Sequence, residues 1–221
     1  MAWALLPVKA RATAKGRLSG ALSDKDRAGL AAAMRRDVAA ALRGTAALQG
    51  VLLLSPDATL RRWGAEQGFE TLDDGGVGLN EALALGLEAL HQRGAGRALI
   101  IPSDVPLLSP EDLTTLLGAP AEVAIASDQR SDGTNGLSVP LGRGFTPHFG
   151  LGSAQAHRRE ARHRGLACQV MLCPGLALDI DQPDDLTTLL QAPAHGPWGQ
   201  ESLTFLYENH LVPRLTPRAA V

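Results

Sequence analysis

Short apolar runs alternate along the chain with longer stretches in which apolar residues recur at helical spacing. Runs rich in Val, Ile and Leu predict strands at 3–8, 51–54, 69–72, 97–101, 122–126, 136–140 and 168–172. Helices are predicted from Ser23 onward, from Ser109 and Pro110 onward, and at 57–67, 80–92, 153–164 and 183–190. This alternation predicts an α/β fold, in which a mostly parallel sheet carries helices on both faces.

The pattern changes after Gln191. Four prolines follow, together with an apolar run at 203–207. We therefore divide the chain into one domain at 1–191 and a C-terminal extension at 192–221 that leaves it. Packing on a second subunit, as in a homodimer, is one expectation for this extension, and a loosely ordered tail is the other.

Composition narrows the class of protein. The chain has 221 residues, of which 45 % are apolar, as expected for a globular domain with a sizeable core. Its 21 basic and 23 acidic residues nearly cancel, which argues against broad binding of nucleic acid or anionic membranes. The beginning lacks the pattern of a signal peptide, and no segment approaches the ~20 apolar residues of a membrane span, so we expect a cytoplasmic protein. Cys168 and Cys173 are too few for a disulfide scaffold.

The first candidate site is a basic segment after the first strand. In open α/β sheets ligands collect at the carboxyl ends of the strands. Pro7 ends the first strand here, and the cations that follow are Lys9, Arg11, Lys15 and Arg17. Lysine as a point charge and arginine as a bidentate donor suit a triphosphate, although the Gly-Lys-Ser/Thr ending of a Walker loop is absent. A solvated basic loop is the alternative.

A glycine-rich segment precedes the helix that begins at Asn80. Gly75, Gly76 and Gly78 allow a close approach of the backbone to a flat ligand, and the first amides of the helix point into the same space. These features suit a flat ligand. For this segment taken alone, however, a flexible turn is the favoured interpretation.

Three carboxylates follow predicted strands. Asp104 stands between Pro102 and Pro106 directly after the strand at 97–101, and a rigid Asp at a strand end is a typical ligand of Mg²⁺. Asp179 and Asp181 point to the same face if their segment is extended, and a shared cation would offset their repulsion. Together these residues predict a site for Mg²⁺ as a cofactor.

A second loop has the features of an anion pocket. Gly150, Gly152 and Ser153 lie at the start of a predicted helix, where backbone amides and a hydroxyl can hold a phosphate or a carboxylate. Thr134 offers a further hydroxyl. His148 lies close by in the sequence, where a surface position is favoured over a contact with the ligand.

These segments, in this order, resemble the guanylyltransferases that build the deazaflavin coenzyme F-420, over about residues 4–190. The matching motifs are Pro7-Val8-Lys9, Lys15-x-Arg17-Leu18, Gly78-Leu79-Asn80, Pro102-Ser103-Asp104-Val105-Pro106-Leu107, Asp132-Gly133-Thr134-Asn135, Phe149-Gly150-x-Gly152-Ser153 and Pro174-Gly175-x-x-x-Asp179-Ile180-Asp181-x-Pro183. Ser103 stands where the family often has Ala, and Leu151 where Pro is frequent.

The resemblance implies a three-layer fold of the nucleotide-diphospho-sugar transferase type, with GTP as donor. The acceptor would be phosphoenolpyruvate, 2-phospho-L-lactate or 3-phospho-D-glycerate. It assigns Mg²⁺ to Asp104, Asp179 and Asp181, and the acceptor to Thr134, Gly150 and Ser153. In the reaction that we expect, Lys15, Arg17 and Asp104 are catalytic, and the nucleotide is bound by Pro7, Lys9, Lys15, Arg17, Gly78 and Asn80.

Two other functions stay open. The same fold transfers nucleotides to sugar phosphates or to molybdopterin, but those enzymes usually have a glycine-rich loop where Pro7-Val8-Lys9 stands here. A non-catalytic nucleotide-binding subunit is the other alternative, and retention of all three carboxylates argues against it.

Overall fold

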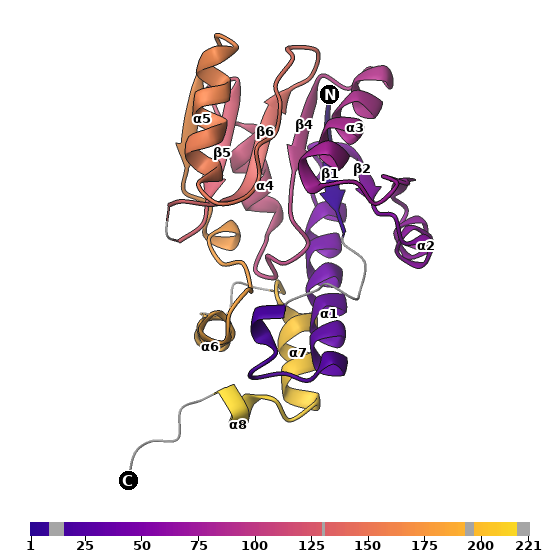
Figure 1. The fold of residues 1–221 in the computed structure, drawn as a ribbon, viewed down its shortest axis with the longest axis vertical. Coiled ribbons are helices and arrows are strands. Elements are labelled where there is room, and N and C mark those ends of the chain that lie inside the picture. The colour runs from indigo at the N-terminus through magenta and orange to yellow at the C-terminus, as the bar shows by residue number, and fades with distance from the viewer. Residues whose placement is uncertain (9–15, 130, 193–196, 216–221) are drawn as a thin grey trace.

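The computed structural model describes residues 1–8, 16–129, 131–192 and 197–215 (Figure 1). Its strands are β1 (Ala2–Pro7), β2 (Leu48–Leu54), β3 (Glu70–Leu72), β4 (Arg97–Ile100), β5 (Val123–Ser127), β6 (Thr134–Pro140) and β7 (Cys168–Met171). Its α-helices are α1 (Asp24–Arg43), α2 (Ala58–Glu66), α3 (Leu79–Gln92), α4 (Pro110–Leu117), α5 (Ser153–His163), α6 (Pro183–Gln191), α7 (Gln200–Glu208) and α8 (Val212–Leu215). Within the described ranges, none of these helices combines the length and the apolar content that crossing a membrane requires.

The strands form one seven-stranded sheet in the order β3-β2-β1-β4-β6-β5-β7. All neighbouring pairs are parallel except those of β6, which runs antiparallel to both β4 and β5. The predicted strands and helices are all present, and the prediction of a mostly parallel α/β sheet is confirmed. Because β6 is reversed, its first residues lie at the edge where the parallel strands end.

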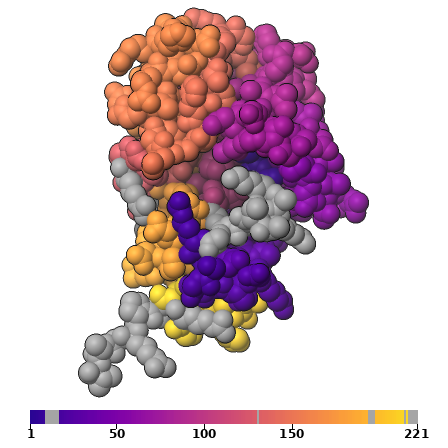
Figure 2. Space-filling model, viewed as in Figure 1, coloured from indigo at the N-terminus to yellow at the C-terminus, as the bar shows by residue number. Residues whose placement is uncertain are grey.

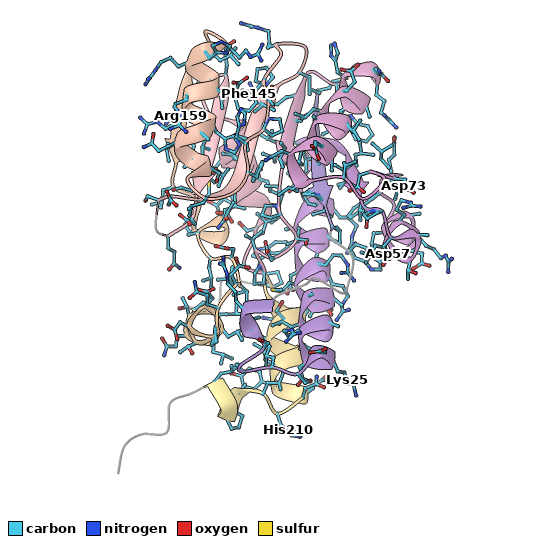
Figure 3. All side chains as sticks on the ribbon, in the orientation of Figure 1. Lys25, Asp57, Asp73, Phe145, Arg159 and His210 are labelled. Carbon is cyan, nitrogen blue, oxygen red and sulfur yellow. The ribbon has the colours of Figure 1, made fainter. Side chains whose placement is uncertain are left out.

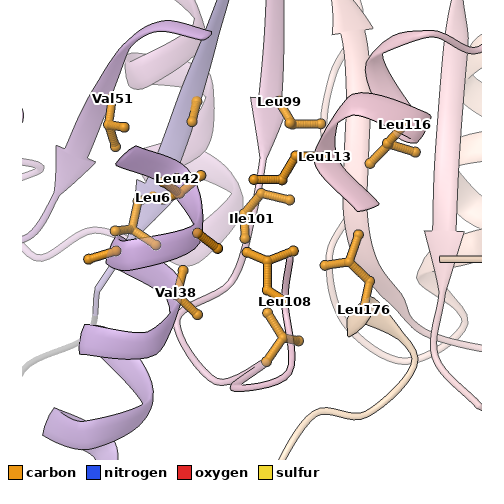
Figure 4. Packing of buried hydrophobic residues seen from close by; sticks show 14 of the residues in the cluster. Leu6, Val38, Leu42, Val51, Leu99, Ile101, Leu108, Leu113, Leu116 and Leu176 are labelled. Carbon is orange, nitrogen blue, oxygen red and sulfur yellow. The ribbon is translucent and has the colours of Figure 1, made fainter. Parts of the chain in front are cut away.

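Helices cover both faces of the sheet and make three layers (Figure 1). One face packs against α1, α2 and α4, and Figure 4 shows part of this core, where Leu6 of β1 lies near Val38 and Leu42 of α1. The other face packs against α3 and α5. The helical spacing of Leu30, Met34, Val38 and Leu42 puts these residues on one face of α1, and all four are fully or almost fully buried.

A third apolar cluster lies outside the sheet and joins the two ends of the chain. It is formed by Leu18, Leu22, Leu30, Met34, Leu107, Leu178, Ile180, Leu186, Leu189, Leu206, Leu211 and Leu215. In Figure 2 the indigo residues that follow Gly16 lie beside the yellow C-terminal helices, below the body of the molecule. We refer to these residues as the third core.

The third core corrects the expectation for the C-terminal extension. We predicted that residues 192–221 leave the domain, but the described part, 197–215, packs on α1 of the same chain. Phe205 of α7 lies so close to Gly29 of α1 that a Cβ at position 29 would overlap its ring. The described part of the extension is therefore a component of the domain core, and a second subunit stays a prediction.

A buried carboxylate fastens α7 to α1. Asp37 accepts hydrogen bonds from the backbone amides of Glu201 and Ser202, at 3.0 and 2.9 Å, and from the Ser202 hydroxyl at 2.6 Å. These amides belong to the first turn of α7, which lacks partners within its own helix. Burial raises the pKa of Asp37 and the hydrogen bonds oppose this rise. Asp37 thus caps a helix from another part of the chain.

We predict that Asp37→Ala lowers the free energy of unfolding by about 2–4 kcal/mol, because it leaves buried donors of α7 without an acceptor. Urea unfolding followed by circular dichroism measures this loss. Glu208→Ala, at the exposed far end of the same helix, is the matched control and is expected to change the stability by less than about 0.5 kcal/mol. Equal effects of the two substitutions would contradict the assignment of Asp37 as the anchor.

Candidate active site

Two carboxylates meet at the carboxyl edge of the sheet. Asp104 follows β4, and its backbone carbonyl accepts a hydrogen bond from the Ile180 amide at 3.1 Å. This bond brings the segment of Asp179 alongside the loop after β4. Burial raises the pKa of Asp179, and the negative charges of Asp104 and Asp181 raise it further. The site therefore concentrates negative charge that a bound cation would offset.

The start of β6 contributes polar side chains to the same edge. Asn135 is buried, and its Nδ2 donates to Asp179 Oδ1 at 3.1 Å. Thr134, its neighbour in the strand, points to the opposite face of the sheet, as alternation along a strand requires. Asn135 is not among the site residues predicted from the ends of strands, because it stands at the beginning of its strand. The motif Asp132-Gly133-Thr134-Asn135 was the signal that could have identified Asn135. Because β6 runs antiparallel to β4, the start of β6 lies at the edge where the parallel strands end.

Asp181 faces the basic segment. Its Oδ2 lies 3.8 Å from Nη1 of Arg17, and both side chains are largely exposed. The short helical turn at Gly16–Leu18 positions this arginine, since Leu18 is fully buried in the third core. Lys9 and Lys15, the other predicted cations of the site, lie outside the described residues. Pro7 ends β1 at the same edge of the sheet.

The donor set agrees with magnesium shared with a phosphate ligand. Among the described residues, no three Asp, Glu, His or Cys side chains converge closely enough to hold a metal ion by themselves. Mg²⁺ is usually bound by one or two carboxylates, with waters and substrate phosphates as its other ligands. Asp104 and Asp179 are both half-buried, and the charge of Asp104 adds to burial in raising the pKa of Asp179, so these two residues supply such a pair.

The glycine-rich segment is held in one conformation by its own aspartates. Asp73 accepts from the Gly75 amide at 2.9 Å and pairs with Arg61 of α2 at 2.8 Å. Asp74 accepts from the Gly76 amide at 3.0 Å, and both glycines have positive φ. Figure 3 shows Asp73 beside α2, near the capping residue Asp57. The segment is thus an ordered turn that leads to Gly78 at the start of α3.

Asn80 joins the glycine-rich segment to the second loop. Its Oδ1 accepts from the Phe149 amide at 2.7 Å, and its Nδ2 donates to the Phe149 carbonyl at 3.0 Å. The side-chain amide therefore pairs with one residue of the other loop much as a neighbouring strand would. This contact uses one donor and one acceptor of the residue that we expect to bind the nucleotide.

The predicted acceptor residues cluster at the start of α5. Ser153 Oγ donates to Thr134 Oγ1 at 3.1 Å, and both residues are buried. Gly150 and Gly152 have φ of 134° and 68°, values that glycine adopts without strain, so this turn requires glycine at both positions. Leu151, between them, is fully exposed. The structure therefore brings Thr134, Gly150 and Ser153 together, on the opposite face of β6 from Asn135.

His157 lies beneath this cluster and was not singled out from the sequence. It is completely buried, and its Nδ1 lies 3.0 Å from Thr134 Oγ1. Its Nε2 accepts from the His148 amide at 2.9 Å, while the side chain of His148 itself is exposed, as predicted. Burial, helped by the charge of His148, lowers the pKa of His157 to about 4. The imidazole is therefore neutral at physiological pH.

Comparisons with known proteins agree with this architecture. A family model described as "Guanylyl transferase CofC like" matches residues 2–208, which include α7 and exceed the span of the resemblance that the motifs gave. A phosphoenolpyruvate guanylyltransferase of Conexibacter woesei is 39 % identical over 85 % of this chain and 86 % of its own. A 3-phospho-D-glycerate guanylyltransferase of Phenylobacterium zucineum is 35 % identical over 93 % of this chain and 95 % of its own.

Solved structures share the fold at low sequence identity. A protein of Desulfovibrio desulfuricans G20, described as a nucleotide-diphospho-sugar transferase, has a TM-score of 0.74 at 17 % identity and covers 98 % of this chain and 99 % of its own. A cytidylyltransferase of Leptospira borgpetersenii has a TM-score of 0.58 at 12 % identity, with coverages of 100 % and 98 %. The predicted nucleotide-diphospho-sugar transferase type of fold is confirmed.

We predict that Asp179→Asn stabilises the ligand-free protein while it abolishes most of its activity. A carboxyl whose pKa is raised by folding contributes stability below its unfolded pKa, and this contribution is lost as the pH rises through the folded pKa. The ionised group therefore costs stability at pH 7. Urea unfolding in EDTA should give a larger free energy of unfolding for the variant than for wild type at pH 7. This difference should shrink as the pH falls toward 4.

Asp184→Asn is the control, because Asp184 is an exposed carboxylate in the first turn of α6. There negative charge favours the helix, so its removal should not stabilise the protein. A variant of Asp179 that is less stable than wild type at pH 7 would contradict our interpretation of the charged edge.

Proposed function

Because this chain belongs to the family of CofC-like guanylyl transferases, we propose that it transfers GMP from GTP to a phosphorylated three-carbon acid and releases pyrophosphate. The observation that carries the proposal is the gathering of Asp104, Asp179 and Asp181 with Arg17 at the carboxyl edge of the sheet, where Asn135 of β6 contacts Asp179 and the neighbouring Thr134 contacts Ser153 on the other face. Carboxylates and cations of this kind suit a nucleoside triphosphate, and hydroxyls at a helix start suit an anionic acceptor.

The donor would lie between the basic segment and the glycine-rich segment. Arg17, together with Lys9 and Lys15, would neutralise the triphosphate and the departing pyrophosphate. Pro7 and Gly78 would border the nucleotide, because they end β1 and precede α3 at the same sheet edge. Asn80 Nδ2 carries two hydrogens, of which one is donated to the Phe149 carbonyl. The other would be donated to the nucleotide.

Asp104 and Asp179 are the pair that would hold Mg²⁺, and Asp181, the third carboxylate that the motifs assign to the ion, would add its negative charge beside them. When bound, the ion supplies neutralisation of phosphate charge and alignment of donor and acceptor oxygens. Asn135 would keep Asp179 oriented through its 3.1 Å hydrogen bond. Because Asp181 lies 3.8 Å from Arg17, its carboxylate would interact either with the cation or with the guanidinium of Arg17.

The acceptor would be seated by Thr134, Gly150 and Ser153. An oxygen of its phosphate attacks the α-phosphorus of GTP, the bond between the α-phosphorus and the bridging oxygen breaks, and pyrophosphate leaves with that oxygen. The protein contributes no covalent group to this step. Its residues position two anions against each other and offset their repulsion, which is the main demand of phosphoryl and nucleotidyl transfer.

The candidate acceptors are phosphoenolpyruvate, 2-phospho-L-lactate and 3-phospho-D-glycerate, and the product would enter the biosynthesis of coenzyme F-420. The similar proteins named above are a phosphoenolpyruvate and a 3-phospho-D-glycerate enzyme, which supports this class of acid over sugar phosphates or molybdopterin. These acids differ by a few atoms, so the shape of the loop at 150–153 would decide among them.

We predict that the protein with GTP and Mg²⁺ releases pyrophosphate only when one of the three acids is added. Pyrophosphate release, measured separately with each acid, identifies the acceptor, and mass spectrometry of the product verifies the attached GMP. Omission of Mg²⁺ should remove the activity.

Asp104→Asn should lower kcat/KM by about 100-fold or more, since one charged group that organises the transition state is lost. Asp184→Asn, with its carboxylate exposed on α6, should stay within about twofold of wild type, as surface substitutions usually do. Near-full activity of the Asp104 variant would refute its assigned role, and absence of turnover with all three acids would refute the proposed function.

A further inference from the structure

We propose that His157 is a positioning residue that fixes Thr134, Ser153 and the loop at 148–152 in the arrangement that receives the acceptor. The proposal rests on the function proposed above. It goes beyond the matched motifs, because His157 belongs to none of them. His157 lies in the second turn of α5, four residues after Ser153, and is completely buried beneath the cluster.

Hydrogen-bond directions fix the tautomer of this imidazole. The His148 backbone amide is a donor only, so Nε2 of His157, at 2.9 Å, must accept from it. In a neutral imidazole the proton then resides on Nδ1, which donates to Thr134 Oγ1 at 3.0 Å. One side chain therefore connects the loop, through His148, with the strand, through Thr134.

The same network sets the direction of the Thr134 hydroxyl. Thr134 Oγ1 accepts from His157 Nδ1 and from Ser153 Oγ, which occupies its two acceptor positions. Its own hydrogen is then left to donate. A hydroxyl fixed as a donor suits a phosphate or carboxylate oxygen, which can only accept. His157 and Ser153 thus prepare Thr134 for an anionic acceptor.

Packing holds the loop against the imidazole. The ring of Phe149 meets that of His157 edge to face, with centroids 4.9 Å apart. The centroid of the Phe145 ring lies 6.1 Å from that of His157, and the two rings are tilted against each other. Figure 3 shows Phe145 beside α5, and its side chain is buried there. Because Asn80 also clamps the backbone of Phe149, the loop is held from both sides.

The kinetic test compares two variants of His157. His157→Phe keeps a ring of similar volume and loses both hydrogen bonds, whereas His157→Asn places an amide nitrogen near the position of Nδ1. For His157→Phe we expect the KM of the acceptor to rise about 10-fold or more, the loss of roughly 1.4 kcal/mol, with the KM of GTP within about twofold. His157→Asn should recover a large part of this loss.

A double-mutant cycle tests whether His157 acts through Thr134. In the background of Thr134→Val, which removes the hydroxyl at nearly constant volume, His157→Phe should raise the KM of the acceptor little further. Additive effects, equal rises in the KM of GTP and of the acceptor, or an unchanged KM of the acceptor in His157→Phe would each overturn the proposal.

A measurement without turnover separates this proposal from the proposed function. Imidazole nitrogen NMR at pH 7 should show His157 as the neutral Nδ1–H tautomer, and hydrogen exchange of the His148 amide should accelerate at least about 10-fold in His157→Phe. An imidazolium, the Nε2–H tautomer or unchanged exchange would refute the positioning role. If these readouts hold while no acid is turned over, only the proposed function fails.

Discussion

The site depends on one constraint, the placement of like charges side by side at the carboxyl edge of the sheet. The backbone hydrogen bond from Ile180 to Asp104 enforces it, since that bond joins the two carboxylate-bearing segments independently of their charges. Burial, together with the charges of Asp104 and Asp181, raises the pKa of Asp179, so the ionised group is held at a cost. Such a cost is tolerated where a ligand repays it, because binding of a cation and a polyanion converts the repulsion into affinity.

The third core keeps this strained edge in place. Leu178 and Ile180 flank Asp179 in sequence and are buried there, and so is Leu18, next to Arg17. The same cluster includes Leu206 and Leu211 from the C-terminal part of the chain. The final helices therefore support the charged residues from beneath. The family match, which extends to residue 208, includes the whole of α7.

The sequence predicted the sheet and its helices well because burial imposes periods of two and 3.6 residues that are visible locally. The glycine loops and the carboxylates were found by residue type and by their position directly after predicted strands or before predicted helices. The C-terminal packing was not predicted, because it depends on Asp37 and Gly29 of α1. These polar and small residues give no apolar pattern, and their role is seen only in their contacts with α7. His157 was missed likewise, since a single histidine on a helix gives no periodic signal, and its partners Thr134 and His148 come from other segments.

Two contacts on Phe149 connect the halves of the site. Asn80 pairs with its backbone from the side of the glycine-rich segment, and the ring of His157 packs against its side chain from the side of α5. The loops proposed for donor and acceptor are therefore joined to each other through Phe149. In a transfer that relies on alignment rather than on a covalent intermediate, fixing the two loops relative to each other reduces the entropy lost when both anions are brought into line. The amide of Asn80 and the imidazole of His157 thus contribute to the reaction by geometry, whichever acid occupies the pocket.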